Sequence, residues 1–206
     1  MKDRLYEEFY DPTDDFAKEP RAFCYDLASQ LIAEAKRTAR NDWLQDTNTV
    51  KGVLLLLFAW NFAAKETKRL NFENVGTLLR KAKPDLQFLE KYSITDADKK
   101  TWRHIKKTFE VFRSVCGQTG ASKALGLLNP RLFVMWDTAI RSRLNKGLVP
   151  GIGNGQTGEQ YVVFLKGVQR IIQKYKIAGK LPPDSIIAKK FDEYNYVRIV
   201  MQTKRA

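Results

Sequence analysis

Residues 117–143 read GQTGASKALGLLNPRLFVMWDTAIRSR, and the order of helix formers and helix breakers in this stretch sets the expected architecture. The glycines at its start predict a tight turn over residues 117–120, followed by a helix over residues 121–128. An Asn-Pro pair then ends that helix, and an apolar link leads to Asp137. Asp137 stands where the N-cap of a helix over residues 138–144 is expected. The stretch therefore predicts two helices around a glycine hairpin, a short link and a third helix.

The rest of the chain also has apolar residues at helical spacing, with no convincing alternating strand pattern and no internal repeat. Pro84 suits the first turn of a helix, and Asp184 is expected to cap the last helix. The further predicted helices cover residues 21–43, 50–68, 71–83, 84–91, a basic helix that begins in 93–98 and ends near 116–117, 159–175, and a last helix after Asp184. We predict an all-α fold of about nine helices. It forms a single helical domain over residues 1–206, or two helical subdomains with a cleft between them.

Charge is the strongest feature of the composition. The chain of 206 residues has a net charge of +13, more than a small domain needs for solubility. Residues 99–146 contain eleven Lys and Arg against two acidic residues, and residues 166–206 contain ten against three. Such an excess indicates a polyanionic partner, because each Lys or Arg laid on a phosphate releases a condensed counterion. Double-stranded DNA is the favoured partner, RNA fits the charge equally, and an anionic membrane surface is the weakest alternative.

Few residues are available for metal, disulfide or histidine chemistry. Cys24 and Cys116 have no spacing typical of a zinc site or a disulfide framework, and His104 is the only histidine. Ser/His/Asp triads and histidine metal clusters are therefore nearly excluded. The acidic N-terminus does not resemble a signal peptide, and the longest apolar run, residues 52–64, is too short to span a bilayer. We expect a cytoplasmic monomer without a metal or cofactor.

The order of features in residues 117–143 resembles the helix-hairpin-helix DNA glycosylase superfamily. These features are the glycine hairpin, the lysine in the next helix, the apolar link, and the Asp that opens another helix. The resemblance covers residues 117–143, about an eighth of the chain. It implies a DNA glycosylase-like fold and a DNA-binding enzyme that removes a damaged or mispaired base. The four-cysteine cluster of endonuclease III is missing from this sequence, so no iron-sulfur centre is expected.

The resemblance also implies roles for individual residues. Lys123 corresponds to the lysine nucleophile of the members that also cleave the strand, and Asp137 corresponds to the acidic residue of the active members. In a hairpin, glycines leave backbone N–H groups accessible, and such groups can bind a phosphate. We therefore expect this region to bind the DNA backbone. The predicted DNA-binding residues are Gly117, Gly120, Ser122, Arg131, Trp136 and Arg141.

Simpler explanations exist for each of these residues. Asp137 can serve only as a helix cap, Lys123 can be a solvated helix lysine, and Trp136 can pack in the core instead of stacking on a base. The alternative function is a non-enzymatic helical nucleic-acid-binding protein. The sequence does not identify the lesion, because residues from separate helices would form the base pocket.

Overall fold

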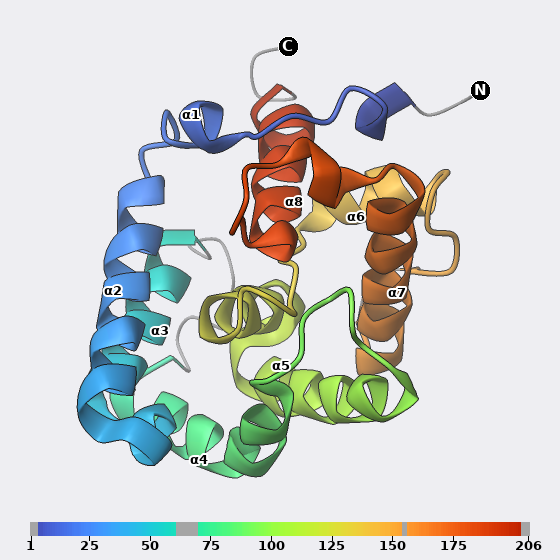
Figure 1. Cartoon of the computed structure of the whole chain (residues 1–206). Helices are drawn as coiled ribbons and strands as arrows, with labels where there is room; N and C mark the ends of the chain where they lie inside the picture. The colour runs from blue at the N-terminus through green and yellow to red at the C-terminus, as the bar shows by residue number, and fades with distance from the viewer. Residues whose placement is uncertain (1–3, 61–69, 154–155, 203–206) are drawn as a thin grey trace.

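The computed structural model of the chain describes residues 4–60, 70–153 and 156–202. This described part contains eight α-helices and no strand, so the prediction of an all-α fold is confirmed. The α-helices are α1 (Thr13–Phe16), α2 (Ala22–Ala39), α3 (Thr47–Trp60), α4 (Phe72–Leu89), α5 (Lys99–Leu128), α6 (Thr138–Asn145), α7 (Gly158–Lys174) and α8 (Ile187–Asn195) (Figure 1). Shorter 3-10 segments are η1 (Arg4–Tyr6), η2 (Arg40–Gln45) and η4 (Ile177–Lys180), and a π-helix, η5 (Tyr196–Met201), continues α8.

Helices α2 and α3 lie side by side along one edge of the molecule (Figure 1). A glycine allows this close packing, because a Cβ added at Gly52 would lie 2.9 Å from the backbone oxygen of Ala28. Helix α2 is shorter than the predicted helix over residues 21–43, since Arg40 adopts a positive φ of 47° and the chain enters η2. The predicted helix over residues 50–68 corresponds to α3, and its part beyond Trp60 lies outside the described residues.

Helix α4 corrects the prediction of two helices that meet at Pro84. It is one continuous helix with the proline inside. A proline removes the hydrogen bond to the carbonyl four residues earlier, which belongs here to Arg80. Both residues are exposed, so water can satisfy that carbonyl, while Leu79 and Leu86 keep the other face of the helix in the core.

Helix α5 contains the predicted glycine break. Gly117 has φ 67° and ψ 175°, and it divides α5 into two helical halves that run in different directions (Figure 1). The non-helical backbone is confined to this residue, so residues 118–120 already belong to the second half and the expected four-residue hairpin is wrong. The side chain of Asp98 caps the first half by accepting hydrogen bonds from the N–H groups of Lys100 and Thr101.

Helices α6 and α7 begin where their capping residues predict. Asp137 accepts a hydrogen bond from the N–H of Ile140, and Thr157 forms a capping box with Gln160 at the start of α7. The predicted helices over residues 138–144 and 159–175 are therefore confirmed. Residues 154–155 of the glycine-rich segment between them lie outside the described residues.

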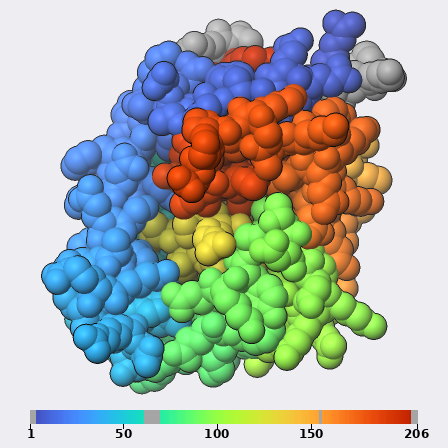
Figure 2. All heavy atoms as spheres, viewed as in Figure 1, coloured from blue at the N-terminus to red at the C-terminus, as the bar shows by residue number. Residues whose placement is uncertain are grey.

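The N-terminal segment packs against the C-terminal helices (Figure 2). Tyr6 stacks on Phe191 with ring centroids 5.1 Å apart, and its hydroxyl donates to Asn195 Oδ1 at 2.6 Å. The predicted cap at Asp184 is wrong. Asp184 has a positive φ of 68°, and α8 begins after Ile186, whose side chain makes no capping hydrogen bond.

Most of the buried apolar residues belong to one continuous cluster that includes side chains from every α-helix from α2 to α8. Phe109, Phe112, Trp136 and Tyr161 are among its largest members, and each is fully buried. Among the described residues, none of the helices combines the length and apolar character needed to cross a bilayer. The second half of α5, the link after it and α8 meet in this core, and together they form the walls of a pocket.

Candidate active site

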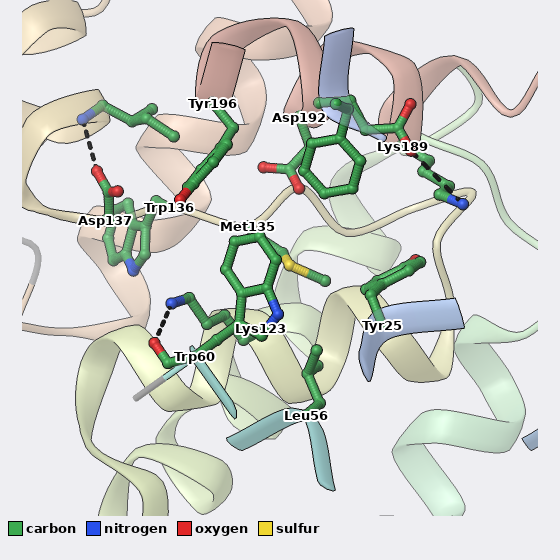
Figure 3. A pocket seen from close by; sticks show the side chains of 13 residues that line it. Tyr25, Leu56, Trp60, Lys123, Met135, Trp136, Asp137, Lys189, Asp192 and Tyr196 are labelled. Atoms are coloured by element: carbon green, nitrogen blue, oxygen red, sulfur yellow. Dashed lines mark hydrogen bonds and ion pairs between the residues drawn. The ribbon is translucent and has the colours of Figure 1, made fainter. Parts of the chain in front are cut away.

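A small cavity of about 30 Å³ lies where α2, α3, α5 and α8 meet the link before α6 (Figure 3). This volume accommodates only one or two water molecules. Apolar side chains form much of the wall: Phe16, Leu56, Trp60, Met135, Trp136 and Ile140. The titratable side chains in the wall are Tyr25, Lys123, Asp137, Lys189, Asp192, Glu193 and Tyr196. The convergence of several titratable groups on one pocket makes it a candidate active site.

Lys123 enters the pocket from the second half of α5. The residue is only 8% exposed, so the alternative of a solvated surface lysine is wrong. Its Nζ donates a hydrogen bond to the carbonyl oxygen of Trp60 at 2.7 Å and lies 5.4 Å from the centroid of the Trp60 ring. Trp60 is the last described residue of α3. The ammonium is thus held on the backbone of a neighbouring helix and beside the cavity.

Asp137 lies at the end of the apolar link and faces the same pocket (Figure 3). Its Oδ1 accepts a hydrogen bond from the N–H of Ile140 at 2.9 Å, which confirms the capping prediction. The capping bond fixes the direction of the carboxylate, and Asp137 also lines the cavity. The capping role and a role in the pocket are therefore compatible.

Asp192 is a pocket residue that the sequence did not single out. It lies on α8 and is only partly exposed. Burial raises the pKa of its carboxyl well above the usual value, and Glu193 and Asp137 raise it further, while Lys123 and Lys189 oppose the shift. The spacing of residues in α8 could have indicated this position. Asp192 follows the buried Ala188 by four residues and therefore falls on the inward face of the helix.

Several residues expected to grip DNA are instead buried. Gly120 is buried, and Ser122 is fully buried with its hydroxyl donating to the carbonyl of Thr119 at 2.9 Å. Ser122 Oγ also accepts a hydrogen bond from the N–H of Trp136 at 3.2 Å, which ties α5 to the apolar link. We correct the assignment of Gly120 and Ser122 as direct phosphate contacts, since both lie inside the fold. Gly117 is partly exposed at the break in α5.

Trp136 and Arg141 require the same correction. Trp136 is fully buried, and its ring packs edge-on against Tyr161 at 4.9 Å between centroids, so core packing is its main role. Arg141 is 5% exposed, and its guanidinium lies 5.1 Å from the Trp136 ring centroid. Burial lowers the pKa of Arg141, and nearby Asp137 opposes this change. Arg131 is exposed and is thus the one predicted DNA-binding arginine whose side chain reaches the surface among the described residues.

A second, wider cleft of about 1380 Å³ has a basic lining. Its charged residues are Arg4, Arg143, Lys146, Lys174 and Arg198, with Glu7 and Glu8. Helix α6 connects the two sites, since its N-cap Asp137 lines the small pocket and Arg143 lines the cleft. A polyanion seated in this cleft would therefore lie close to the pocket.

In the described ranges, no group of three or more His, Cys, Asp or Glu side chains has an arrangement that could hold a metal ion. Comparisons with protein-family models, curated proteins and solved structures found no match for the chain.

Proposed function

We propose that the protein is a DNA-binding base-excision enzyme that resembles the helix-hairpin-helix DNA glycosylases and removes a damaged or mispaired base. The observation that carries this proposal is the convergence of Lys123 and Asp137 on one pocket (Figure 3). The net charge of +13 and the basic cleft beside α6 support a nucleic-acid partner.

The chemistry begins with extrusion of a nucleotide from the duplex, because the glycosidic carbon is inaccessible inside the base stack. Positive charge develops on the sugar as the base departs, and the carboxylate of Asp137 stabilises that charge or takes a proton from the nucleophile. The amine of Lys123, once neutral, attacks the sugar and forms a Schiff base that permits strand cleavage. This step requires the Lys123 amine to leave the carbonyl of Trp60.

The second candidate is a non-enzymatic protein that binds nucleic acid through the same basic surface. The hydrogen bond from Lys123 to the Trp60 carbonyl favours it, because a buried lysine that donates to a backbone carbonyl also stabilises the fold. In this case Lys123 and Asp137 hold α3 and α6 in place and take no part in chemistry.

Incubation with duplexes that carry different damaged or mispaired bases, followed by borohydride trapping, tests the proposal. We expect base release and a covalent adduct from the wild type, loss of the adduct in Lys123→Ala, and loss of base release by roughly 100-fold or more in Asp137→Asn. Release that survives Lys123→Ala would indicate a glycosylase without lyase activity.

Matched controls separate chemistry from folding. Asp98→Asn changes another helix-capping aspartate, outside the pocket, and Lys99→Ala removes an exposed lysine from the same helix as Lys123. Both should retain full activity. Salt-dependent duplex binding without release of any base would contradict the enzymatic proposal and support the binding protein, and a flat response to salt would contradict both.

A further inference from the structure

The carboxyl of Asp192 faces the pocket without a polar partner (Figure 3). Within residues 4–60, 70–153 and 156–202, no hydrogen bond or ion pair engages it. Its sequence neighbour Glu193 shows the contrast, because Glu193 pairs with Lys189 at 3.5 Å and with Lys190 at 3.1 Å. A carboxyl group that makes no hydrogen bond or ion pair and lines a pocket is available to act on a ligand.

The groups around Asp192 come from several elements. Lys123 lines the same pocket from α5, Asp137 from the link before α6, Lys189 and Glu193 from α8, and Tyr25 and Tyr196 from α2 and η5. Tyr161 on α7 also interacts electrostatically with the Asp192 carboxyl. Burial raises the pKa of the Asp192 carboxyl, as do the two neighbouring acidic residues, and these effects exceed the opposing influence of the two lysines. Asp192 therefore retains a proton above the usual range of a carboxylic acid.

We propose that Asp192 is the acid that protonates the leaving base while the glycosidic bond breaks, a role that rests on the proposed function. In this step the bond between the sugar carbon and the base nitrogen breaks, and its electron pair stays with the base. The proton of the Asp192 carboxyl moves to the base, which leaves as a neutral molecule. The sugar carbon bonds to the Lys123 amine or to water, Asp137 takes the proton released by that nucleophile, and solvent later protonates Asp192 again.

The two aspartates have environments suited to opposite roles. Asp137 Oδ1 accepts a hydrogen bond from the N–H of Ile140, whereas no donor among the described residues reaches Asp192. Pairs of carboxyl groups in different environments divide acid and base roles in this way. The assignment of Asp192 as acid and Asp137 as base or electrostatic group follows from this difference.

The chemistry of the leaving base provides the test. Duplexes would carry either a neutral lesion (hypoxanthine, uracil or 8-oxoguanine) or 7-methylguanine, whose positive charge lets it leave as a neutral molecule without an acid. Single-turnover base release would be measured from pH 5 to 9 for the wild type, for Asp192→Asn and for the control Asp98→Asn. We expect Asp192→Asn to slow release of neutral bases about 100-fold or more and release of 7-methylguanine by less than about threefold. Duplex binding should remain unchanged.

The pH profile gives a second readout. Release of a neutral base by the wild type should fall as the pH rises and Asp192 loses its proton, and this decline should disappear in Asp192→Asn. Equal losses for neutral and cationic bases, an unchanged pH profile, or a wild type that releases only 7-methylguanine would overturn the role of Asp192 while leaving the proposed function intact. A wild type that releases no base would overturn the proposed function and this role with it.

Carboxyl carbon NMR of protein labelled at aspartate tests the premise without catalysis. The wild type should contain one carboxyl that titrates at distinctly higher pH than the others, and this signal should be missing from Asp192→Asn. If all aspartates titrate together in the folded protein, Asp192 is not the acid.

Discussion

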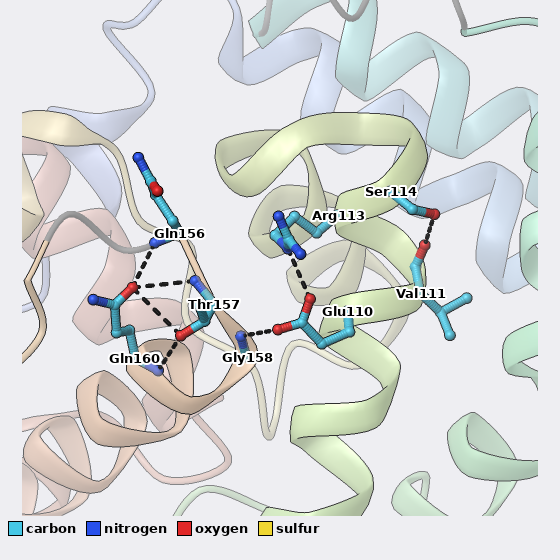
Figure 4. A network of polar contacts seen from close by, with 8 residues as sticks. All are labelled: Glu110, Val111, Arg113, Ser114, Gln156, Thr157, Gly158 and Gln160. Carbon is cyan, nitrogen blue, oxygen red and sulfur yellow. Dashed lines mark hydrogen bonds and ion pairs between the residues drawn. The ribbon is translucent and has the colours of Figure 1, made fainter.

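Glu110 and Asp192 are carboxylic acids at helix contacts, yet their surroundings are opposite. Glu110 joins the first half of α5 to the start of α7: its Oε1 accepts a hydrogen bond from the N–H of Gly158 at 2.6 Å, and its Oε2 accepts one from Arg113 at 2.8 Å (Figure 4). Asp192 lies in a pocket of apolar and titratable side chains, and no described residue donates a hydrogen bond to it. Burial alone would raise the pKa of both carboxyls, but the bonds from Gly158 and Arg113 lower the pKa of Glu110 below its usual value. The donors around a carboxyl thus determine whether it holds two helices together or stays available for reaction.

Among the variants that test this comparison, Gly158→Ala is expected to change the free energy of unfolding most. A Cβ at this position would lie 2.6 Å from the backbone oxygen of Lys106, so α7 must move away from α5 and the bond to Glu110 must weaken. We expect a loss of about 3 kcal/mol in the free energy of unfolding, measured by urea denaturation. Gly76→Ala is the matched control, because its nearest neighbour atom would be 4.0 Å from the new Cβ. The control should be neutral or stabilising by about 0.5–1 kcal/mol, and equal losses in both variants would contradict the close contact at Gly158.

A smaller effect is expected from Glu110→Gln, which weakens the hydrogen bond to Gly158. The loss should be about 1 kcal/mol near neutral pH. The folded protein lowers the pKa of Glu110, so this carboxylate stabilises the fold above its unfolded pKa, and the contribution disappears as the pH falls through the folded value. Wild type and variant should therefore converge in acid. Arg113→Ala, which removes only the exposed partner, should cost less, about 0.5 kcal/mol.

A small effect of opposite sign is expected from Asp192→Asn. The folded protein raises the pKa of Asp192, so ionisation of the carboxyl costs stability once the pH exceeds its unfolded value, and the cost grows until the pH passes the folded value. The variant avoids this cost, and we expect a gain of about 0.5–1 kcal/mol at neutral pH that fades in acid. A variant that is less stable than the wild type at every pH would show that Asp192 holds the fold together, as Glu110 does.

Much of the fold could be predicted from local sequence signals. Capping by Asp137 and the break at Gly117 depend on side-chain and backbone chemistry within a few residues, and both are confirmed. Pro84 and Asp184 gave wrong predictions for a physical reason. The exposed face of α4 tolerates a proline inside the helix, and the positive φ of Asp184 places the residue before the start of α8. Tertiary packing determined both outcomes.

The site was predictable only in part. Lys123 and Asp137 share one short segment, and the two residues line the same pocket. Asp192 follows Asp137 by 55 positions, and its place in the pocket depends on where α8 lies in the folded protein, which the local sequence does not encode. Burial of Ser122 and Arg141 is likewise a property of packing, because both residues are polar and nothing in the local sequence distinguishes them from surface residues.

The small volume of the pocket has a kinetic consequence. A cavity that holds one or two waters has no room for a nucleobase, so the proposed base excision requires the wall to open before a base can enter. The apparent dissociation constant of an extruded base then equals its intrinsic constant divided by the fraction of molecules that are open. Met135, an unbranched side chain in the wall, is suited to move aside because thioethers change rotamer at low cost. Discrimination among bases would then begin at the opening step, before any bond to the sugar is broken.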